Sequence, residues 1–167
     1  MKTRIARTLF SPLLLAFSAL AWTAPEVEIS DLSRLDKSYM AQQRLLLDDL
    51  ARSSFGGQLN GQKANDLALL QRLLDDGLVT ADQTQELQAM GVIMGDLLAE
   101  ELDMDWVIYT DQLGRSRALR YRETDIYLFP ITMISRRREA DNRESVARIY
   151  DRASGNVLAR REPLPFQ

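Results

Sequence analysis

Residues 87–110, LQAMGVIMGDLLAEELDMDWVIYT, contain the point at which the sequence changes from a helical pattern to a strand pattern. In the first part, bulky apolar residues recur at the spacing of one helical face, at Leu87, Met94, Leu98 and Leu102. The run 106–110 (WVIYT) is instead β-branched and aromatic, which is typical of a strand. Because helical and strand segments occupy separate parts of the chain, we predict an α+β fold.

The helical part of this stretch has a smooth side, formed by Gly91, Gly95 and Ala99 at intervals of four residues. Each glycine inside a helix costs about 1 kcal/mol relative to alanine, so we expect these two to let another backbone approach closely. Packing on another helix of the same chain is the favoured interpretation, and contact between two copies in a homodimer is the alternative. Three acidic residues in the same segment exclude a membrane span here.

The expected order of elements is three helices, a small antiparallel sheet of two or three strands, and one or two further helices. Gly77 closes the second helix, and Thr80 with Gln83 forms a capping box that starts the third. Pro130 either opens a helix or lies on an edge strand, and we favour the helix. The predicted helices cover residues 30–54, 62–76, 80–102, 130–139 and, from 142 or 145, up to 155; the predicted strands cover 106–110, 115–121 and 125–129.

The N-terminus has the pattern of a secretory signal peptide. Basic residues precede the apolar run 9–21, which is too short to span a bilayer. Ala19 and Ala21 place small residues at positions −3 and −1, so we predict cleavage after Ala21. An uncleaved N-terminal anchor is the alternative. We therefore expect a periplasmic or secreted protein with no membrane span after cleavage, and export without cysteines fits a bacterial periplasm.

Four regions follow from this interpretation. Residues 1–21 are the signal peptide, and 22–29 are a short tether. Residues 30–155 form a single α+β domain, and 156–167 form a loose C-terminal tail. The mature chain is long enough to bury a core without disulfides.

The chain contains no cysteine and no histidine. Their absence excludes disulfides, thiolate and imidazole metal ligands, thiol nucleophiles and the Ser-His-Asp arrangement. No phosphate-binding glycine loop is present, and residues 103–114 do not match a calcium loop. We expect no metal and no cofactor. The 24 acidic residues leave a carboxylate-dependent hydrolase, acting on cell-wall glycan, open as an alternative.

Charge is distributed unevenly along the mature chain. Residues 22–105 contain 16 acidic and 6 basic residues, whereas residues 106–167 contain 8 acidic and 12 basic residues. Either the two halves attract each other or the second half faces an anion. Nucleic acid is not an expected partner, because the mature protein is acidic and lacks basic patches interleaved with aromatic residues.

The arginines of the second half suggest a binding surface. Strand alternation places Arg115 and Arg117 on one face and Arg120 on the other. One face can gather Arg120 and Arg136 around Tyr121, and guanidinium groups suit carboxylate or phosphate. Internal pairing with the acidic half is the favoured interpretation of these arginines. The candidate anion-recognising residues are Arg115, Arg120, Tyr121, Ser135 and Arg136.

An ordered set of short runs resembles a known bacterial family. The runs are 69–75 (LLQRLLD), 87–95 (LQAMGVIMG), Trp106, Asp111, 114–115 (GR), 118–121 (ALRY) and 129–136 (FPITMISR). On these residues the chain resembles the domain of unknown function DUF3806, over about residues 62–140. The resemblance implies a small α+β domain that is often exported, and it implies no activity, substrate or catalytic residue.

These observations favour a non-catalytic binding or interaction module in the periplasm. Its partner is expected to be a periplasmic protein or a small anionic ligand. The glycan hydrolase is one alternative. The other is a homodimeric structural protein whose copies meet at the stripe of Gly91, Gly95 and Ala99, called the glycine stripe below. The protein itself is expected to be a monomer or a homodimer.

Overall fold

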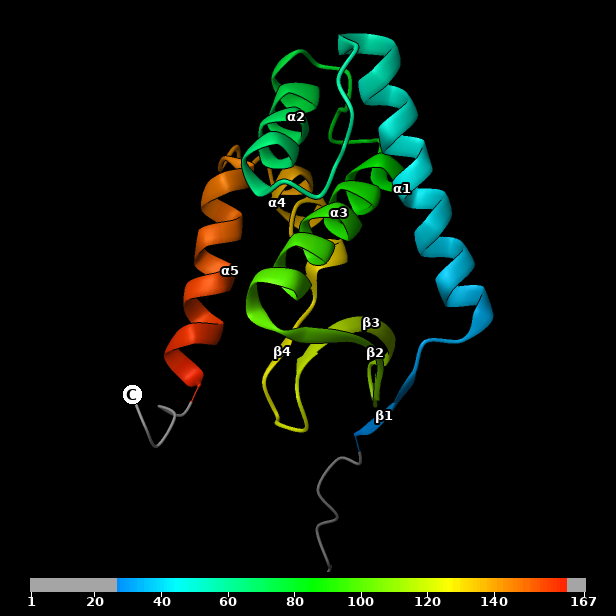
Figure 1. Cartoon of the computed structure of the whole chain (residues 1–167), viewed down its shortest axis with the longest axis vertical. Coiled ribbons are helices and arrows are strands. Elements are labelled where there is room, and N and C mark those ends of the chain that lie inside the picture. The colour runs from blue at the N-terminus through cyan, green and yellow to red at the C-terminus, as the bar shows by residue number, and fades with distance from the viewer. Residues whose placement is uncertain (1–26, 162–167) are drawn as a thin grey trace, which may run out of the picture.

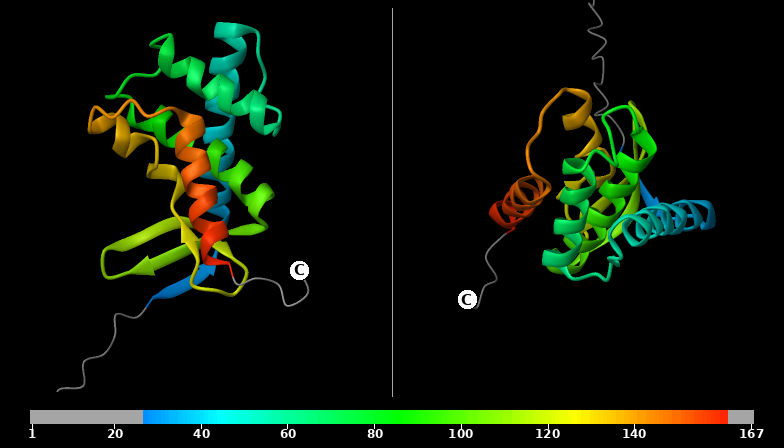
Figure 2. Two further views of the ribbon diagram at one scale, coloured as in Figure 1. Left: turned by 90° about the vertical axis from the view of Figure 1, so that its left-hand side faces the viewer. Right: turned by 90° about the horizontal axis from the view of Figure 1, so that it is seen from above.

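Helix α3 (Thr84–Leu102) lies at the centre of the protein, between α1 (Arg34–Phe55) and α5 (Val146–Arg160) (Figures 1 and 2). The sheet lies below α3 in the view of Figure 1. The structure is a computed structural model that describes residues 27–161. The predicted signal peptide, and residues 162–167 of the predicted tail, lie outside the described residues. The remaining elements are β1 (Glu28–Asp31), α1 (Arg34–Phe55), α2 (Lys63–Asp75), β2 (Met104–Asp111), β3 (Gly114–Tyr121), β4 (Tyr127–Leu128), the 3₁₀ turn η1 (Pro130–Thr132), α4 (Ser135–Glu139) and α5 (Val146–Arg160).

The described part of the chain contains one antiparallel sheet, with strand order β1-β2-β3-β4. The hairpin between β2 and β3 reverses at Gly114, whose φ of 126° suits glycine and strains other residues. Its register pairs Trp106 with Leu119, so that both side chains lie on the face toward the helices. The α+β class is confirmed, but the sheet has four strands where two or three were predicted.

The extra strand is β1, whose first two residues were predicted to be tether and whose last two were predicted to start the first helix. Glu28 pairs with Thr110 and Asp31 with Val107, so β1 extends the edge of the sheet. The prediction was wrong because three of these four residues are polar and exposed, which leaves no alternating pattern to detect. As a consequence, the first helix begins at Arg34 with Ser33 as its N-cap, a few residues later than expected.

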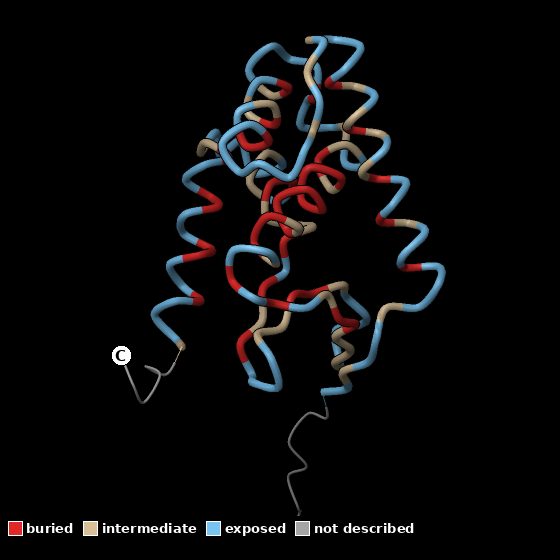
Figure 3. The backbone as a smooth tube through the Cα atoms, in the orientation of Figure 1, coloured by how far each residue is buried: buried red, intermediate tan, exposed pale blue. Residues whose placement is uncertain are grey.

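The core is built around α3, whose residues from Leu87 to Leu102 are nearly all buried (Figure 3). Helices α1 and α5 bury only one face each, toward α3. On α5 the buried Tyr150 donates its hydroxyl hydrogen to the backbone oxygen of Leu97 at 3.2 Å. One cluster of buried side chains therefore joins the helices to the inner face of the sheet.

The glycine stripe of α3 is filled by the chain segment that leaves the sheet, and not by another helix as predicted. A Cβ built at Gly91 would lie 2.4 Å from the backbone oxygen of Ile131. A Cβ at Gly95 would lie 2.4 Å from the ring of Trp106 and 3.0 Å from Pro130 Cβ. The two glycines thus let η1 and the Trp106 ring lie directly on the helix surface, as the expected close approach requires.

Pro130 opens a helical segment, as favoured, but the segment is divided. Pro130 occupies the first position of η1, and the α-helical part starts only at Ser135. The backbone carbonyls of Pro130 and Ile131 in η1 lie directly against Gly91 of α3.

Two helix ends differ from the prediction. The Thr80 backbone N–H donates to the side-chain oxygen of Gln83 at 2.8 Å. This contact belongs to a turn, because α3 begins only at Thr84. Helix α5 continues past Gly155 to Arg160, so residues 156–160 are helical and not part of a loose tail. Val157 is buried on the inner face of α5, and this burial outweighs the low helix propensity of Gly155.

The glycine contacts predict opposite effects of the same substitution at two helical sites. Gly91→Ala would drive a methyl group into the backbone of η1, and we expect the free energy of unfolding to fall by about 2 kcal/mol or more. Gly155→Ala meets no atom within 4 Å, and we expect it to raise the free energy of unfolding by about 0.5–1 kcal/mol. Urea unfolding of both variants measures the difference, and a tolerated Gly91→Ala would contradict the packing described here.

Candidate functional site

A buried carboxylate at the start of α1 ties this helix to the sheet. Asp36 is 1% exposed and forms a reciprocal capping box with Ser33. The Ser33 backbone N–H donates to Asp36 Oδ2 at 3.0 Å, and the Ser33 hydroxyl donates to the same oxygen at 2.5 Å. These contacts fix the Asp36 side chain relative to the helix axis and direct its carboxylate toward β3.

Two arginines of β3 bind this carboxylate. Arg115 donates from Nη1 and Nη2 to the two Asp36 oxygens at 3.0 and 2.5 Å, and Arg117 Nη2 lies 2.9 Å from Oδ1. The hydrogen bonds from Arg115 lower the pKa of Asp36 well below its usual range and outweigh burial, which acts in the opposite direction. Arg117 also stacks on the Tyr39 ring, 4.2 Å from its centroid. Part of the arginine set is therefore paired internally with the acidic half, as favoured.

A cavity of about 320 Å³ opens beside this ion pair, and we call it the arginine cavity. Five elements or their flanking residues surround it: α1, α3, β3, η1 and α4. Its walls combine three guanidinium groups, three uncharged polar side chains and three apolar or aromatic ones. The lining residues are Arg115, Arg117, Arg136, Gln88, Ser116, Thr132, Tyr39, Phe129 and Ile131.

Arg136 differs from the other two arginines of the cavity. Its side chain is exposed, and within residues 27–161 it forms no ion pair. The neighbouring Arg137 is instead paired with Glu144 at 3.1 Å. Three guanidinium groups and one buried carboxylate leave the arginine cavity with a net positive charge, which suits a carboxylate or a phosphoryl group.

The structure brings together two of the five predicted site residues, Arg115 and Arg136. Arg120 lies on the opposite face of β3, where its Nε donates to the Thr124 carbonyl at 2.9 Å. Tyr121 is flanked by the guanidinium groups of Arg122 and Arg161. Ser135 is 2% exposed and does not line the cavity. The expected gathering of Arg120 and Arg136 around Tyr121 is therefore not formed.

Seven of the nine residues that line the cavity were not among the predicted site residues. Arg117 was detectable, because strand alternation already placed it beside Arg115. Tyr39, Gln88 and Thr132 come from three different elements, and only the packing of α1, α3 and η1 brings them to β3. No local sequence signal identifies such residues.

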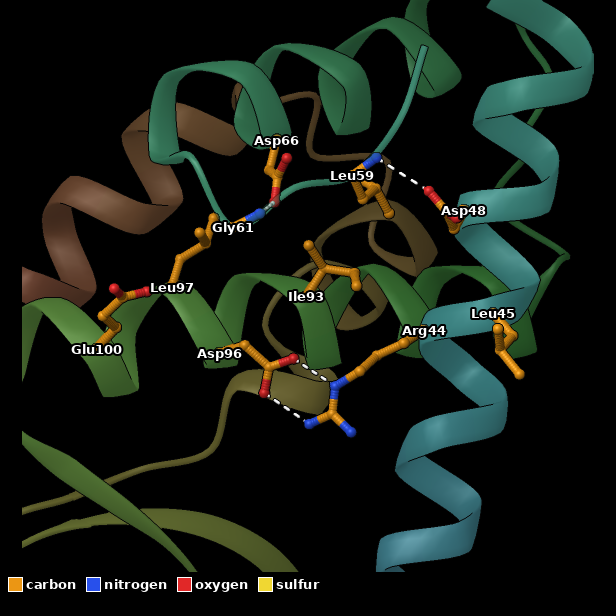
Figure 4. Close-up of a pocket in the computed structure, with 10 residues that line it drawn as sticks. All are labelled: Arg44, Leu45, Asp48, Leu59, Gly61, Asp66, Ile93, Asp96, Leu97 and Glu100. Atoms are coloured by element: carbon orange, nitrogen blue, oxygen red, sulfur yellow. Dashed lines mark hydrogen bonds and ion pairs between the residues drawn. The ribbon is translucent and has the colours of Figure 1, made fainter. Parts of the chain in front are cut away.

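A second pocket, of about 280 Å³, lies between α1, α3 and the loop before α2 (Figure 4). Its aspartates are occupied by structural contacts. Asp96 receives two hydrogen bonds from Arg44 at 2.6 and 2.8 Å, and a third from Trp106 Nε1 at 3.0 Å. Asp48 accepts from the Leu59 backbone and Asp66 from the Asn60 and Gly61 backbones. These carboxylates hold the loop and the helices together.

Carboxyl chemistry has little support in the part of the chain that the structure describes. A general acid needs a raised pKa, whereas the carboxyl groups with a shifted pKa, Asp36, Asp82 and Glu101, are all shifted downward by hydrogen bonds. Within the same residues, no three acidic side chains are grouped so as to hold a metal ion.

Comparison with known proteins places the chain in a family. Residues 66–150 match the domain of unknown function DUF3806, and the chain belongs to this family. The match covers most of α2, all of α3 and the hairpin, η1 and α4, so it includes every lining residue of the arginine cavity except Tyr39. A search of curated proteins gave no significant match.

A crystal structure of a protein from Bacteroides thetaiotaomicron VPI-5482 has a similar fold, with a TM-score of 0.68 and 17% sequence identity. The alignment covers 76% of this chain and 47% of that chain. The chain therefore spans about half the length of the similar protein, and the likeness is one of fold.

The Asp36 ion pair predicts a specific acid sensitivity. The pKa of an unfolded aspartate is about 3.9, and the pKa of folded Asp36 is lower. The unfolded chain therefore takes up the proton first as pH falls, so that the stabilisation is complete at pH 7 and declines below about pH 4. Asp36→Asn should lower the free energy of unfolding by about 3 kcal/mol at pH 7, and this difference should narrow at pH 2.5.

Urea unfolding of the wild type and the variant at both pH values measures this effect. Asp49→Asn, on the exposed side of the same helix, is the matched control and should unfold like the wild type. A difference that stays constant from pH 7 to pH 2.5 would show that the ionised Asp36 does not stabilise the fold.

Proposed function

We propose that the protein is an exported, non-catalytic binding module that recognises an anionic group in the arginine cavity. The observation that carries the proposal is Arg136, an exposed guanidinium next to two guanidinium groups whose positions are already fixed by Asp36. Because these donors are already fixed, they lose little conformational entropy when a ligand binds, and this lowers the free-energy cost of binding. The partner is a small anion or the acidic segment of a periplasmic protein.

The alternatives have weaker support. A glycan hydrolase needs two free carboxyl groups across a cleft, whereas the aspartates of the second pocket hold structural groups. The glycine stripe no longer supports a homodimer, because η1 and Trp106 already cover the helix surface at Gly91 and Gly95. A binding module, as a monomer or as a dimer through another surface, is the function that we favour.

Export to the periplasm is a further part of the proposal. It rests on the basic start, the apolar run 9–21 and the Ala19 and Ala21 pair, since residues 1–26 are outside the described part of the chain. None of the helices within residues 27–161 is both long and apolar enough to cross a membrane.

Arg136→Gln tests the function of the cavity. We expect citrate and phosphate, at a fixed ionic strength set with chloride, to raise the melting temperature of the wild type. At about ten times the dissociation constant, the stabilisation is about 1.4 kcal/mol, or about 3–5 °C. The Arg136→Gln variant should lose most of this shift. In chloride alone it should melt at the same temperature as the wild type, because Arg136 has no ion partner within residues 27–161.

Arg143→Gln is the control, since Arg143 is also exposed but belongs to a different part of the surface. It should respond to citrate and phosphate like the wild type. Equal shifts in the Arg136 and Arg143 variants, or no shift in the wild type, would contradict anion recognition at the arginine cavity.

The export proposal makes a separate prediction about the N-terminus. When the full chain is expressed in a Gram-negative host, mass spectrometry of the periplasmic fraction should find a protein that begins at Trp22. Replacing Ala21 by a bulky residue should block this cleavage, because small residues are required at position −1. A full-length protein in the cytoplasm would contradict the proposal.

A further inference from the structure

The net charge of the arginine cavity follows from the charged side chains that line or contact it. Arg115, Arg117 and Arg136 contribute three positive charges, and Asp36 is the one carboxylate in contact with them within residues 27–161. The cavity therefore has an excess of two positive charges. A ligand with two negative charges would neutralise this excess, whereas a ligand with one negative charge would leave one positive charge unmatched.

The hydrogen-bond donors of the cavity exceed what Asp36 uses. A guanidinium has five N–H groups in a planar fork. Arg115 uses two of them on Asp36 and Arg117 uses one, and the fork of Arg136 is unused within the described residues. Thr132 and Gln88 add a hydroxyl and an amide. A phosphoryl group offers three terminal oxygens to these donors, whereas a carboxylate offers two.

Size and wall chemistry restrict the rest of the ligand. The cavity volume of about 320 Å³ lies near the lower end of the range of ligand pockets, about 300–1,000 Å³. Phe129 is 38% exposed and is held in place by an edge contact with Tyr109, 5.3 Å between ring centroids. Together with Ile131 it gives the cavity an apolar wall beside the charged one.

We infer that the ligand of the arginine cavity is a small phosphomonoester, with its dianionic head on the three arginines and a short apolar or aromatic body against Phe129 and Ile131. This inference rests on the proposed function, because it requires that the cavity binds an anion at all. Beyond the proposed function, this inference specifies that the head group of the ligand is a dianion and that the ligand has a short apolar body.

Phenyl phosphate and benzenesulfonate are a matched pair of probes. Both join a benzene ring to a head group with three terminal oxygens, but at pH 7.5 phenyl phosphate has about two charges and benzenesulfonate one, since the second phosphate pKa is about 6. By calorimetry at pH 7.5 we expect phenyl phosphate to bind at least about tenfold more tightly. It should also bind more tightly than inorganic phosphate, which lacks the body.

The change in affinity between pH 7.5 and pH 5 reports the ionisation of the ligand and not of the protein. The chain contains no histidine, and the titratable residues that face the cavity are arginines, a tyrosine and the ionised Asp36, whose ordinary pKa values lie outside pH 5–7.5. At pH 5 phenyl phosphate is mostly a monoanion, and an advantage of about tenfold over benzenesulfonate should fall to about twofold. Arg136→Gln should remove most of that advantage at pH 7.5, and Arg143→Gln should retain it.

The outcomes separate the two proposals. Equal affinity for phenyl phosphate and benzenesulfonate at pH 7.5 would overturn the dianion inference and leave anion recognition standing. Equal affinity for phenyl phosphate and inorganic phosphate would overturn the apolar body. No binding of any probe would overturn the proposed function as well.

A lipid head group is the other source of a phosphomonoester. Vesicles of phosphatidylcholine with phosphatidic acid test this source by co-sedimentation. Because the inferred ligand is a small free phosphomonoester, we expect the wild type, Arg136→Gln and Arg143→Gln to co-sediment with the vesicles to the same extent. Recruitment that depends on Arg136 would overturn the assignment to a small free ligand.

Discussion

The close approach of η1 and Trp106 to Gly91 and Gly95 is the contact on which the rest of the structure depends. It sets the distance between the central helix and the sheet, because Trp106 belongs to β2. It also sets the path of the chain after β4, since η1 lies against the same helix surface. Thr132 and Arg136 follow directly from this path, so the packing of two glycines positions one wall of the arginine cavity.

A second part of the cavity lining depends on another contact, the ion pair of Asp36 with Arg115 and Arg117. This pair joins α1 to β3 and at the same time fixes two guanidinium groups at the edge of the cavity. The arginines are therefore not divided into structural and functional ones. An internal carboxylate holds two of them in place, and the exposed Arg136 completes a set that is more positive than its own fold requires.

The sequence predicted those features that arise from local patterns, and it did not predict those that arise from packing. The helical stripe of α3, the hairpin with Gly114 and the helical segment after Pro130 all have periodicities or turn residues that are visible in the chain. Strand β1 was missed because an edge strand of polar residues depends on its partner for its conformation. Of the predicted site residues, Arg115 and Arg136 line the arginine cavity. Arg120 lies on the other face of β3, whereas Tyr121 shares the face of Arg115 but lies at the far end of the strand. Strand alternation separates the two faces of β3, but only the packing of the helices shows where along the strand a cavity is left.

The measurement that tests the central claim most directly is an NMR titration of the ¹⁵N-labelled mature chain with phenyl phosphate. Binding in the arginine cavity predicts chemical-shift changes in the Nε–H groups of Arg115, Arg117 and Arg136 and in the backbone amides of Ile131 and Thr132. These changes should saturate with one dissociation constant. Changes confined to the region of Arg138 and Arg143, or changes that grow linearly without saturation, would contradict a binding site at the arginine cavity.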